Sequence, residues 1–213
     1  MSVSAKTAAV GGVLALLALL GASWYLTTRT GVEDPLAQCR IGARAGAAKI
    51  GGPFTLISET GATVTEKDVI TGPSLVYFGY TWCPDVCPID STRNAAAADL
   101  LTSRGYDVTP VFISVDHARD TPESLREFTD LMSPKMIGLT GSEAQIDAVV
   151  RTYRAYYRVA EPGNPETLID HSTQTYLMDP MRGYLDFYDR DVSPEAMAES
   201  VACFIDALKT NTK

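Results

Sequence analysis

A stretch of 22 residues without a single charge, from Thr7 to Thr28, divides this chain into two parts. As a helix rising 1.5 Å per residue, this stretch would be about 33 Å long, enough to cross a hydrocarbon core of about 30 Å. Trp24 and Tyr25 stand near its outer end, where aromatic rings favour a membrane interface. A cleaved signal peptide or a buried core helix is also apolar, but the run is longer than a usual signal core. We therefore expect an uncleaved transmembrane anchor over residues 7–28.

Charge is distributed unevenly about this stretch. All 26 acidic residues and 16 of the 18 basic residues lie beyond residue 30, so that part carries a net charge of −10. A net-acidic chain without a cluster of cations is poorly suited to nucleic acid, and we exclude that class of partner. We expect residues 1–6 to be a short cytoplasmic N-terminus of a single-pass protein in the bacterial cytoplasmic (inner) membrane. The domain would then face the periplasm.

The rest of the chain has the pattern of an α/β protein. A Gly/Ala-rich linker over residues 29–51 precedes one domain over residues 52–213. We predict a short hairpin at 54–57 and around 64, strands at 74–80, 108–115 and 137–139, a second hairpin at 175–178 and 184–188, and helices at 88–104, 122–132, 142–156 and 193–209. Strands and helices that alternate before a closing hairpin and helix are the order of a thioredoxin-like fold, a mixed sheet flanked by helices.

Two of the four cysteines, Cys83 and Cys87, stand between the strand that ends at Tyr80 and the helix predicted from Pro88. The carboxyl ends of strands gather ligand sites, and a helix N-terminus favours a thiolate over a thiol. The C-x-x-x-C spacing is one residue longer than the redox pair of thioredoxins. A permanent disulfide and a zinc site are two readings, although structural zinc usually needs four protein ligands. Two thiolates with one imidazole suit Cu(I), and can also hold Cu(II).

The chain has only two histidines that could complete such a site. His117 follows the strand ending at Val115, and His171 precedes the strand predicted from Thr175. Spacing alone favours neither. Asp85, between the cysteines, tunes a thiolate or orients a partner in one reading, and is a solvated loop carboxylate in the other, which we favour.

The segment YFGYTWCPDVCP, residues 77–88, resembles the copper-site motif of the SCO/SenC family. Three further blocks agree in order: ISVD at 113–116 followed by RDTPE at 119–123, GLTG at 138–141, and DHS at 170–172 with YLMDP at 176–180. The likeness covers about residues 52–208. These proteins are membrane-anchored, thioredoxin-like copper chaperones of cytochrome c oxidase assembly. The resemblance implies that Cys83, Cys87 and His171 are the copper ligands.

The resemblance implies delivery of copper to the binuclear copper centre of cytochrome c oxidase subunit II. The cargo would be Cu(I), and Cu(II) as an alternative, with another periplasmic copper carrier and a thiol reductant as further partners. A redox-dependent Cys83–Cys87 disulfide would be the copper-free form. This role needs no enzymatic activity. The alternatives are a thiol-disulfide reductase for subunit II, in which Cys83 and Cys87 would be catalytic, and a copper or redox sensor.

Two features depart from the family's pattern. His117 stands where the family commonly has a proline, and is a spare ligand, a docking group for copper, or without a role. Cys39 and Cys203 lie outside the family's motif. In an exported protein such cysteines can pair, whereas two buried or free thiols are the alternative. We predict a Cys39–Cys203 disulfide, which would tie the linker to the last helix.

Overall fold

The structure is a computed structural model that describes residues 5–29, 36–41 and 50–210. The chain divides into two compact units, Met1–Gln38 and Cys39–Lys213. Most of the predicted cytoplasmic N-terminus and much of the predicted linker, at 30–35 and 42–49, lie outside the described residues. The second unit begins at Cys39, earlier than the domain start that we predicted at residue 52.

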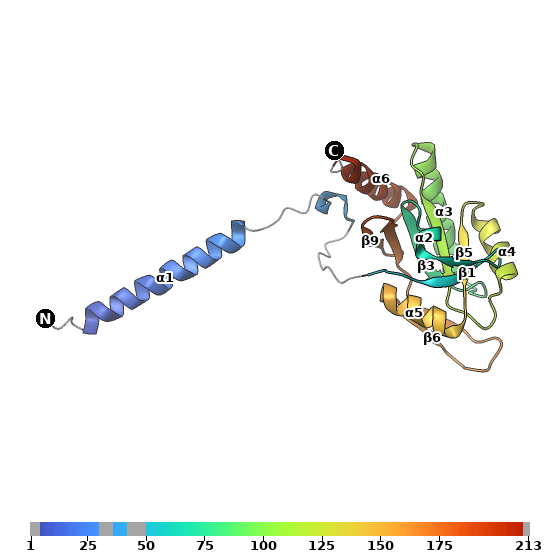
Figure 1. Cartoon of the computed structure of the whole chain (residues 1–213), viewed down its shortest axis with the longest axis horizontal. Helices are drawn as coiled ribbons and strands as arrows, with labels where there is room; N and C mark the ends of the chain where they lie inside the picture. Colours follow the sequence, from blue (N-terminus) through green and yellow to red (C-terminus); the bar gives the residue numbers. More distant parts are fainter. Residues whose placement is uncertain (1–4, 30–35, 42–49, 211–213) are drawn as a thin grey trace. The chain divides into compact units, whose positions relative to one another are not determined.

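The first unit contains one long helix, α1 (Ala5–Arg29), drawn in blue in Figure 1. The helix covers the uncharged stretch, and its side chains are described over residues 12–25. In the part of the chain that the structure describes, no helix has the length and apolarity needed to span a membrane.

The second unit is built on a seven-stranded mixed sheet in the order β2-β1-β5-β4-β3-β8-β9, with a separate hairpin of β6 and β7. Strands β3, β4 and β5 are parallel, whereas β1 and β8 run antiparallel to their neighbours. The elements are η1 (Ala37–Cys39), β1 (Thr55–Ser58), β2 (Thr63–Thr65), α2 (Glu66–Val69), β3 (Ser74–Gly79), α3 (Val86–Ser103), β4 (Thr109–Ser114), α4 (Pro122–Met132), β5 (Ile137–Thr140), α5 (Glu143–Tyr153), β6 (Tyr157–Val159), β7 (Ile169–His171), β8 (Thr175–Asp179), β9 (Gly183–Tyr188) and α6 (Pro194–Thr210).

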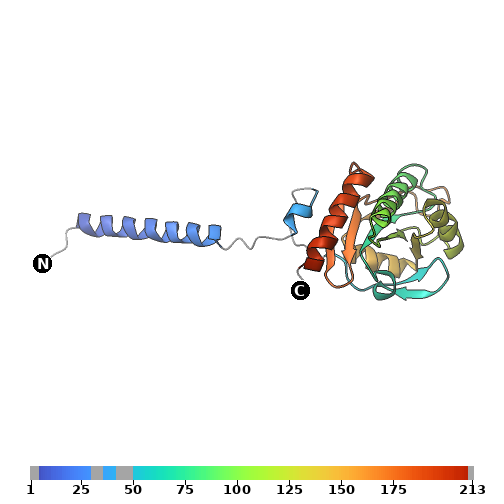
Figure 2. The same cartoon turned by 90° about the horizontal axis from the view of Figure 1, so that it is seen from above.

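Strand β3 lies in the interior of this sheet and is buried along its whole length. Its neighbours are β4 and β8, and helices cover both faces of the sheet. Helices α3, α4 and α6 lie on one face and α5 on the other (Figures 1 and 2). A strand covered on both faces must be apolar throughout, which is why SLVYFG shows no alternation with polar residues. The predicted α/β class, with a mixed sheet of thioredoxin-like order, is confirmed.

Local differences from the sequence-based expectations bear on the site. Helix α3 begins at Val86 rather than at Pro88, so Cys87 belongs to its first turn. The short strands β6 and β7 were not predicted, and His171 is the last residue of β7 rather than part of a loop. Helix α5 ends at Tyr153, because Arg154 adopts a left-handed conformation with φ of 53°.

Cys39 and Cys203 form a disulfide, as the sequence predicts. It joins η1 to α6, and the Ser200 hydroxyl donates a hydrogen bond of 2.6 Å to the Cys39 carbonyl oxygen. The guanidinium of Arg40 lies 3.7 Å from an Asp186 carboxylate oxygen and stacks 5.6 Å above the ring centre of Phe204. These contacts dock the segment around residue 39 against α6 and β9, so it belongs to the folded unit.

The disulfide closes a loop with a sequence separation of 164 residues. We expect Cys203→Ser to lower the free energy of unfolding by about 2–5 kcal/mol, since the cross-link restricts the unfolded chain. Urea unfolding of the soluble domain measures this loss. Cys39→Ser and the double variant should lose the same amount, because all three lack one bond. Wild-type stability in both single variants, with no linked peptide in a non-reducing digest, would contradict this prediction.

Candidate metal centre

The two motif cysteines reach the end of β3 from two adjoining segments. Cys83 lies in the turn after β3, where its backbone N–H donates to the Tyr80 carbonyl oxygen at 3.3 Å. Cys87 lies in the first turn of α3, and its N–H donates to the Cys83 Sγ at 3.4 Å. A Cβ on Gly79 would come within 3.0 Å of the Cys87 Sγ, so only glycine permits the helix to start this close to the strand. Both cysteines are buried free thiols.

A buried carboxylate holds the turn that carries Cys83. Asp120 is 3 % exposed and accepts hydrogen bonds from the Thr81 N–H at 2.9 Å and the Thr81 hydroxyl at 2.6 Å. The Ser114 hydroxyl at the end of β4 donates to the same carboxylate at 2.6 Å. Burial raises the pKa of Asp120, whereas the hydrogen bonds from Ser114 and Thr81 lower it. The carboxylate thus fastens the cysteine turn to the carboxyl end of β4.

His171 reaches the cysteines from the β6–β7 hairpin, where it pairs with Tyr157. Its Nδ1 lies 2.9 Å from the Ser172 carbonyl oxygen, which can only accept, so Nδ1 carries the proton. The lone pair is then on Nε2, which lies 3.3 Å from the Cys87 Sγ. The ring of Tyr80 stands edge-on to the imidazole at 5.7 Å between centres. His171 is therefore presented with a free nitrogen facing the thiols.

The three side chains form one compact set of donor atoms. The Sγ atoms of Cys83 and Cys87 and a ring nitrogen of His171 all lie within 4.8 Å of one another. Burial lowers the pKa of His171, which keeps its imidazole neutral at pH 7. Burial also raises the pKa of Cys87, so the expectation that the helix N-terminus favours its thiolate is wrong for this residue. The cluster binds a metal only by giving up that proton.

The other candidate residues lie apart from this cluster. Among the residues that the structure describes, the one group of His, Cys, Asp and Glu able to hold a metal is Cys83, Cys87 and His171, and His117 is not in it. A fourth protein ligand, which structural zinc usually requires, is absent from that group. Asp85 is exposed, as expected of a solvated loop carboxylate.

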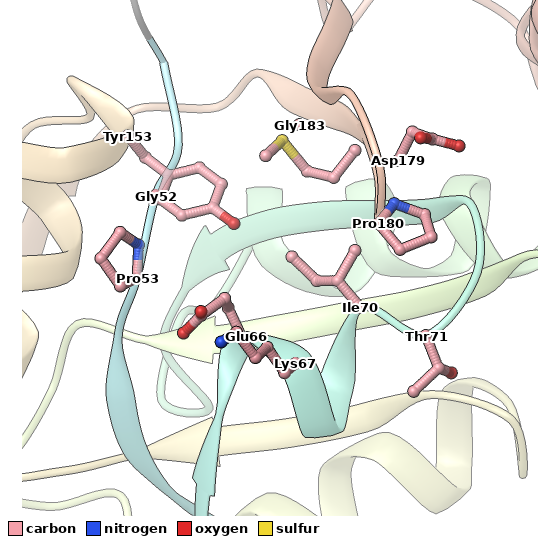
Figure 3. A pocket seen from close by; sticks show the side chains of 11 residues that line it. Gly52, Pro53, Glu66, Lys67, Ile70, Thr71, Tyr153, Asp179, Pro180 and Gly183 are labelled. Atoms are coloured by element: carbon pink, nitrogen blue, oxygen red, sulfur yellow. The ribbon is translucent and has the colours of Figure 1, made fainter.

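A separate cavity of about 540 Å³ lies toward the opposite end of β3 (Figure 3). Its lining includes Glu66, Ile70 and Tyr153, and its upper side in Figure 3 carries Asp179 and Pro180 from the β8–β9 turn. Since Ser74 pairs with Met178, this cavity flanks the start of β3, whereas the cysteines follow its end. The metal cluster is therefore not part of it.

Comparison with known proteins agrees with this geometry. Residues 42–206 match the sequence profile of SCO1/SenC. The chain belongs to the SCO1/SenC family. It is 67 % identical over 210 residues to the protein SenC of Rhodobacter capsulatus, covering 99 % of this chain and 95 % of that protein. It is 44 % identical over 161 residues to the mitochondrial SCO1 homolog 1 of Arabidopsis thaliana, covering 75 % of this chain and 48 % of that protein, so it spans about half of that relative.

Solved structures of family members share the fold. Arabidopsis thaliana ScoI with copper bound is 41 % identical, with a TM-score of 0.70 over 76 % of this chain and 99 % of that chain. Yeast Sco1 with copper bound is 32 % identical, with a TM-score of 0.67 over 76 % of this chain and 90 % of that chain. The thioredoxin-like fold of this SCO1/SenC protein is therefore shared with copper-bound relatives.

Metal binding at this cluster should depend on pH. Because burial raises the pKa of Cys87, its thiol is protonated at neutral pH and a bound ion must displace the proton. We expect the apparent affinity for a soft ion such as Cu(I) to rise about tenfold per pH unit between pH 7 and 8.5, for each proton released. Competition with a Cu(I) chelator measures it. An affinity of the wild type that does not change with pH would contradict the prediction.

Proposed function

We propose that this protein is a copper chaperone that delivers copper to the binuclear copper centre of cytochrome c oxidase subunit II. The observation that carries the proposal is the set of two thiols and one imidazole, with all three donor atoms within 4.8 Å of one another. The copper-bound relatives from Arabidopsis thaliana and yeast support it, since both share this fold at more than 30 % identity.

The donor set suits a soft ion of low coordination number. Thiolate sulfur and imidazole nitrogen favour Cu(I), and the imidazole also suits Cu(II). Cu(I) favours low coordination numbers, so two thiolates and one imidazole can hold it without a fourth protein ligand. In the copper-free protein the two thiols can instead be oxidised to a Cys83–Cys87 disulfide, which would prevent binding because thiolates are the ligands. Copper loading would thus require a thiol reductant.

Release of copper is by exchange of ligands. Cys87 is fully buried and Cys83 is 7 % exposed, whereas His171 is half-buried at the outer side of the cluster. Thiolates of an acceptor can attack Cu(I) from that side, and each departing thiolate of the donor takes up a proton, whereas the His171 imidazole leaves as a neutral group. The oxidation state of copper does not change in this step. A three-coordinate ion accepts the incoming ligand readily because its coordination shell is incomplete.

Three single substitutions, one for each proposed copper ligand, test the ligand set. Reduced soluble domain should bind one tight equivalent of Cu(I) in competition with a chelator. Cys83→Ala, Cys87→Ala and His171→Ala should each abolish that tight equivalent, since removing one of three donors leaves a two-coordinate site. His117→Ala is the matched control and should bind as the wild type does. Wild-type protein that binds no copper, or that binds with an affinity indifferent to His171, would refute the proposal.

An assay of cytochrome c oxidase assembly, with substitutions of the same residues, separates a second candidate function. The two free thiols, whose sulfur atoms lie close together, are also the pair that a thiol-disulfide reductase needs, with one thiolate attacking and the other resolving. If His171→Ala keeps oxidase assembly while Cys83→Ser abolishes it, the reductase is favoured over the chaperone. A copper or redox sensor would bind the metal but, in a purified system, would not transfer copper to subunit II.

We further propose that residues 7–28 anchor the protein in the bacterial cytoplasmic membrane, with the domain in the periplasm. The support is the uncharged stretch of 22 residues, which α1 includes, and the net charge of −10 beyond it. In that compartment the domain can meet subunit II, a periplasmic copper carrier that supplies the ion, and the thiol reductant. The Cys39–Cys203 disulfide suits an oxidising compartment.

Protease added to intact spheroplasts tests this topology. We expect the domain to be degraded while a cytoplasmic marker protein survives, and the protein to sediment with membranes until detergent is added. A domain that stays intact until the spheroplasts are lysed would show the opposite orientation and overturn the proposal.

A further inference from the structure

One buried carboxylate close to the metal cluster is not a member of it. Asp90 is 1 % exposed and lies on α3, one turn after Cys87. A buried carboxylate is costly unless it is paired and hydrogen-bonded, so its partners indicate what it holds in place. It accepts a hydrogen bond of 3.0 Å from the Tyr77 hydroxyl. It also lies 3.2 Å from the Arg190 Nε and 3.9 Å from the Arg93 Nη1.

The two arginines fix Asp90 from different parts of the fold. Arg93, on α3, donates at 3.0 Å to the Asp189 carbonyl oxygen just after β9 and at 2.9 Å to the Thr175 hydroxyl at the start of β8. Arg190 is the second residue after the end of β9. The carboxylate therefore stands where α3, β8 and the end of β9 meet. With partners on several sides it is a fixed acceptor rather than a mobile one.

The phenol that Asp90 holds is in turn a wall of the metal cluster. Tyr77 is 1 % exposed, and a Cβ on Gly79 would lie 2.9 Å from its Cε1 and 3.0 Å from the Cys87 Sγ. The phenol and the second thiol thus flank the same point above β3. The Tyr77 ring also stands edge-on to the His171 imidazole, with 6.1 Å between ring centres and 89° between planes. Two of the three donors therefore pack against one aromatic ring.

We propose that Asp90 is a positioning residue of the copper site and acts through Tyr77. The inference rests on the copper-binding function proposed above and adds a determinant outside its three ligands. The Asp90 carboxylate holds the phenol by its hydroxyl, and the phenol sets where the Cys87 Sγ and the His171 Nε2 lie before copper arrives. Donors that are already in place lose less conformational freedom on binding, so the ion is held more tightly. With only three donors, the site depends strongly on that alignment.

Tyr77→Phe tests the inference, because it removes the hydroxyl and keeps the ring. We expect Cu(I) binding to the reduced soluble domain to weaken about 3- to 10-fold, as for the loss of one neutral or charge-assisted hydrogen bond. The thiolate-to-metal charge-transfer band of the Cu(II) complex should shift, since the thiolate geometry changes. Asp90→Ala should weaken binding similarly. The double variant should bind Cu(I) no more weakly than the single variant with the lower affinity. Both substitutions break the same hydrogen bond between Tyr77 and Asp90.

Tyr188→Phe is the matched control. Tyr188 is also wholly buried, and its hydroxyl is hydrogen-bonded at 3.0 Å to Ser200 on α6 rather than to Asp90. It should lose stability while keeping the Cu(I) affinity and the spectrum of the wild type.

Unchanged affinity and spectrum in Tyr77→Phe would overturn the role of Asp90 while leaving the copper site itself intact. Additive losses in the double variant would also overturn it, since Asp90 would then act without Tyr77. If Asp90→Ala does not fold, Tyr77→Phe decides alone. Absence of copper binding in the wild type would refute the chaperone function and this inference together.

Discussion

The metal cluster depends on a close approach between one helix and one strand. Helix α3 starts so near the end of β3 that the Cys87 Sγ would be 3.0 Å from a Cβ on Gly79, and the glycine leaves that space open. The approach brings the second cysteine onto the buried strand β3, whose other residues are packed on both faces. The geometry of the turn that carries Cys83 follows from this close approach. The turn between strand and helix must be short, and the buried carboxylate of Asp120 ties it to the neighbouring strand β4.

Burial at this point gives the cluster a particular chemical state. A thiol in the first turn of a helix is usually expected to lose its proton readily, but desolvation outweighs the helix N-terminus for Cys87 and raises its pKa. His171 is affected in the opposite sense, because burial lowers its pKa and keeps the ring neutral. In the copper-free site, Cys87 and His171 are therefore both neutral. Negative charge develops only when a cation arrives to balance it, which links metal loading to proton release.

The sequence predicted the parts of the fold that have strong periodic or apolar signals. Strand β3, its neighbouring strands and the main helices were found because long apolar runs and N-terminal caps such as Thr121 mark them. The β6–β7 hairpin escaped prediction because its strands have only three residues each, with Arg158 and Asp170 exposed on them. His171 sits on that hairpin, so spacing could not select it over His117, and the family resemblance could. The contact of Asp90 with Tyr77 joins residues 13 apart across a strand and a helix, and only packing reveals it.

The Cys39–Cys203 disulfide has a mechanical consequence. The chain before residue 39 meets the folded unit at a covalent bond to α6, and the Ser200 hydroxyl and the Arg40 guanidinium reinforce that junction. A pull on the preceding chain is therefore borne first by the terminal helix, which packs against α3. The strand β1, which begins at Thr55, carries none of that load while the bond is intact. The sheet that supports the cysteine turn is thus shielded from tension in the chain before residue 39.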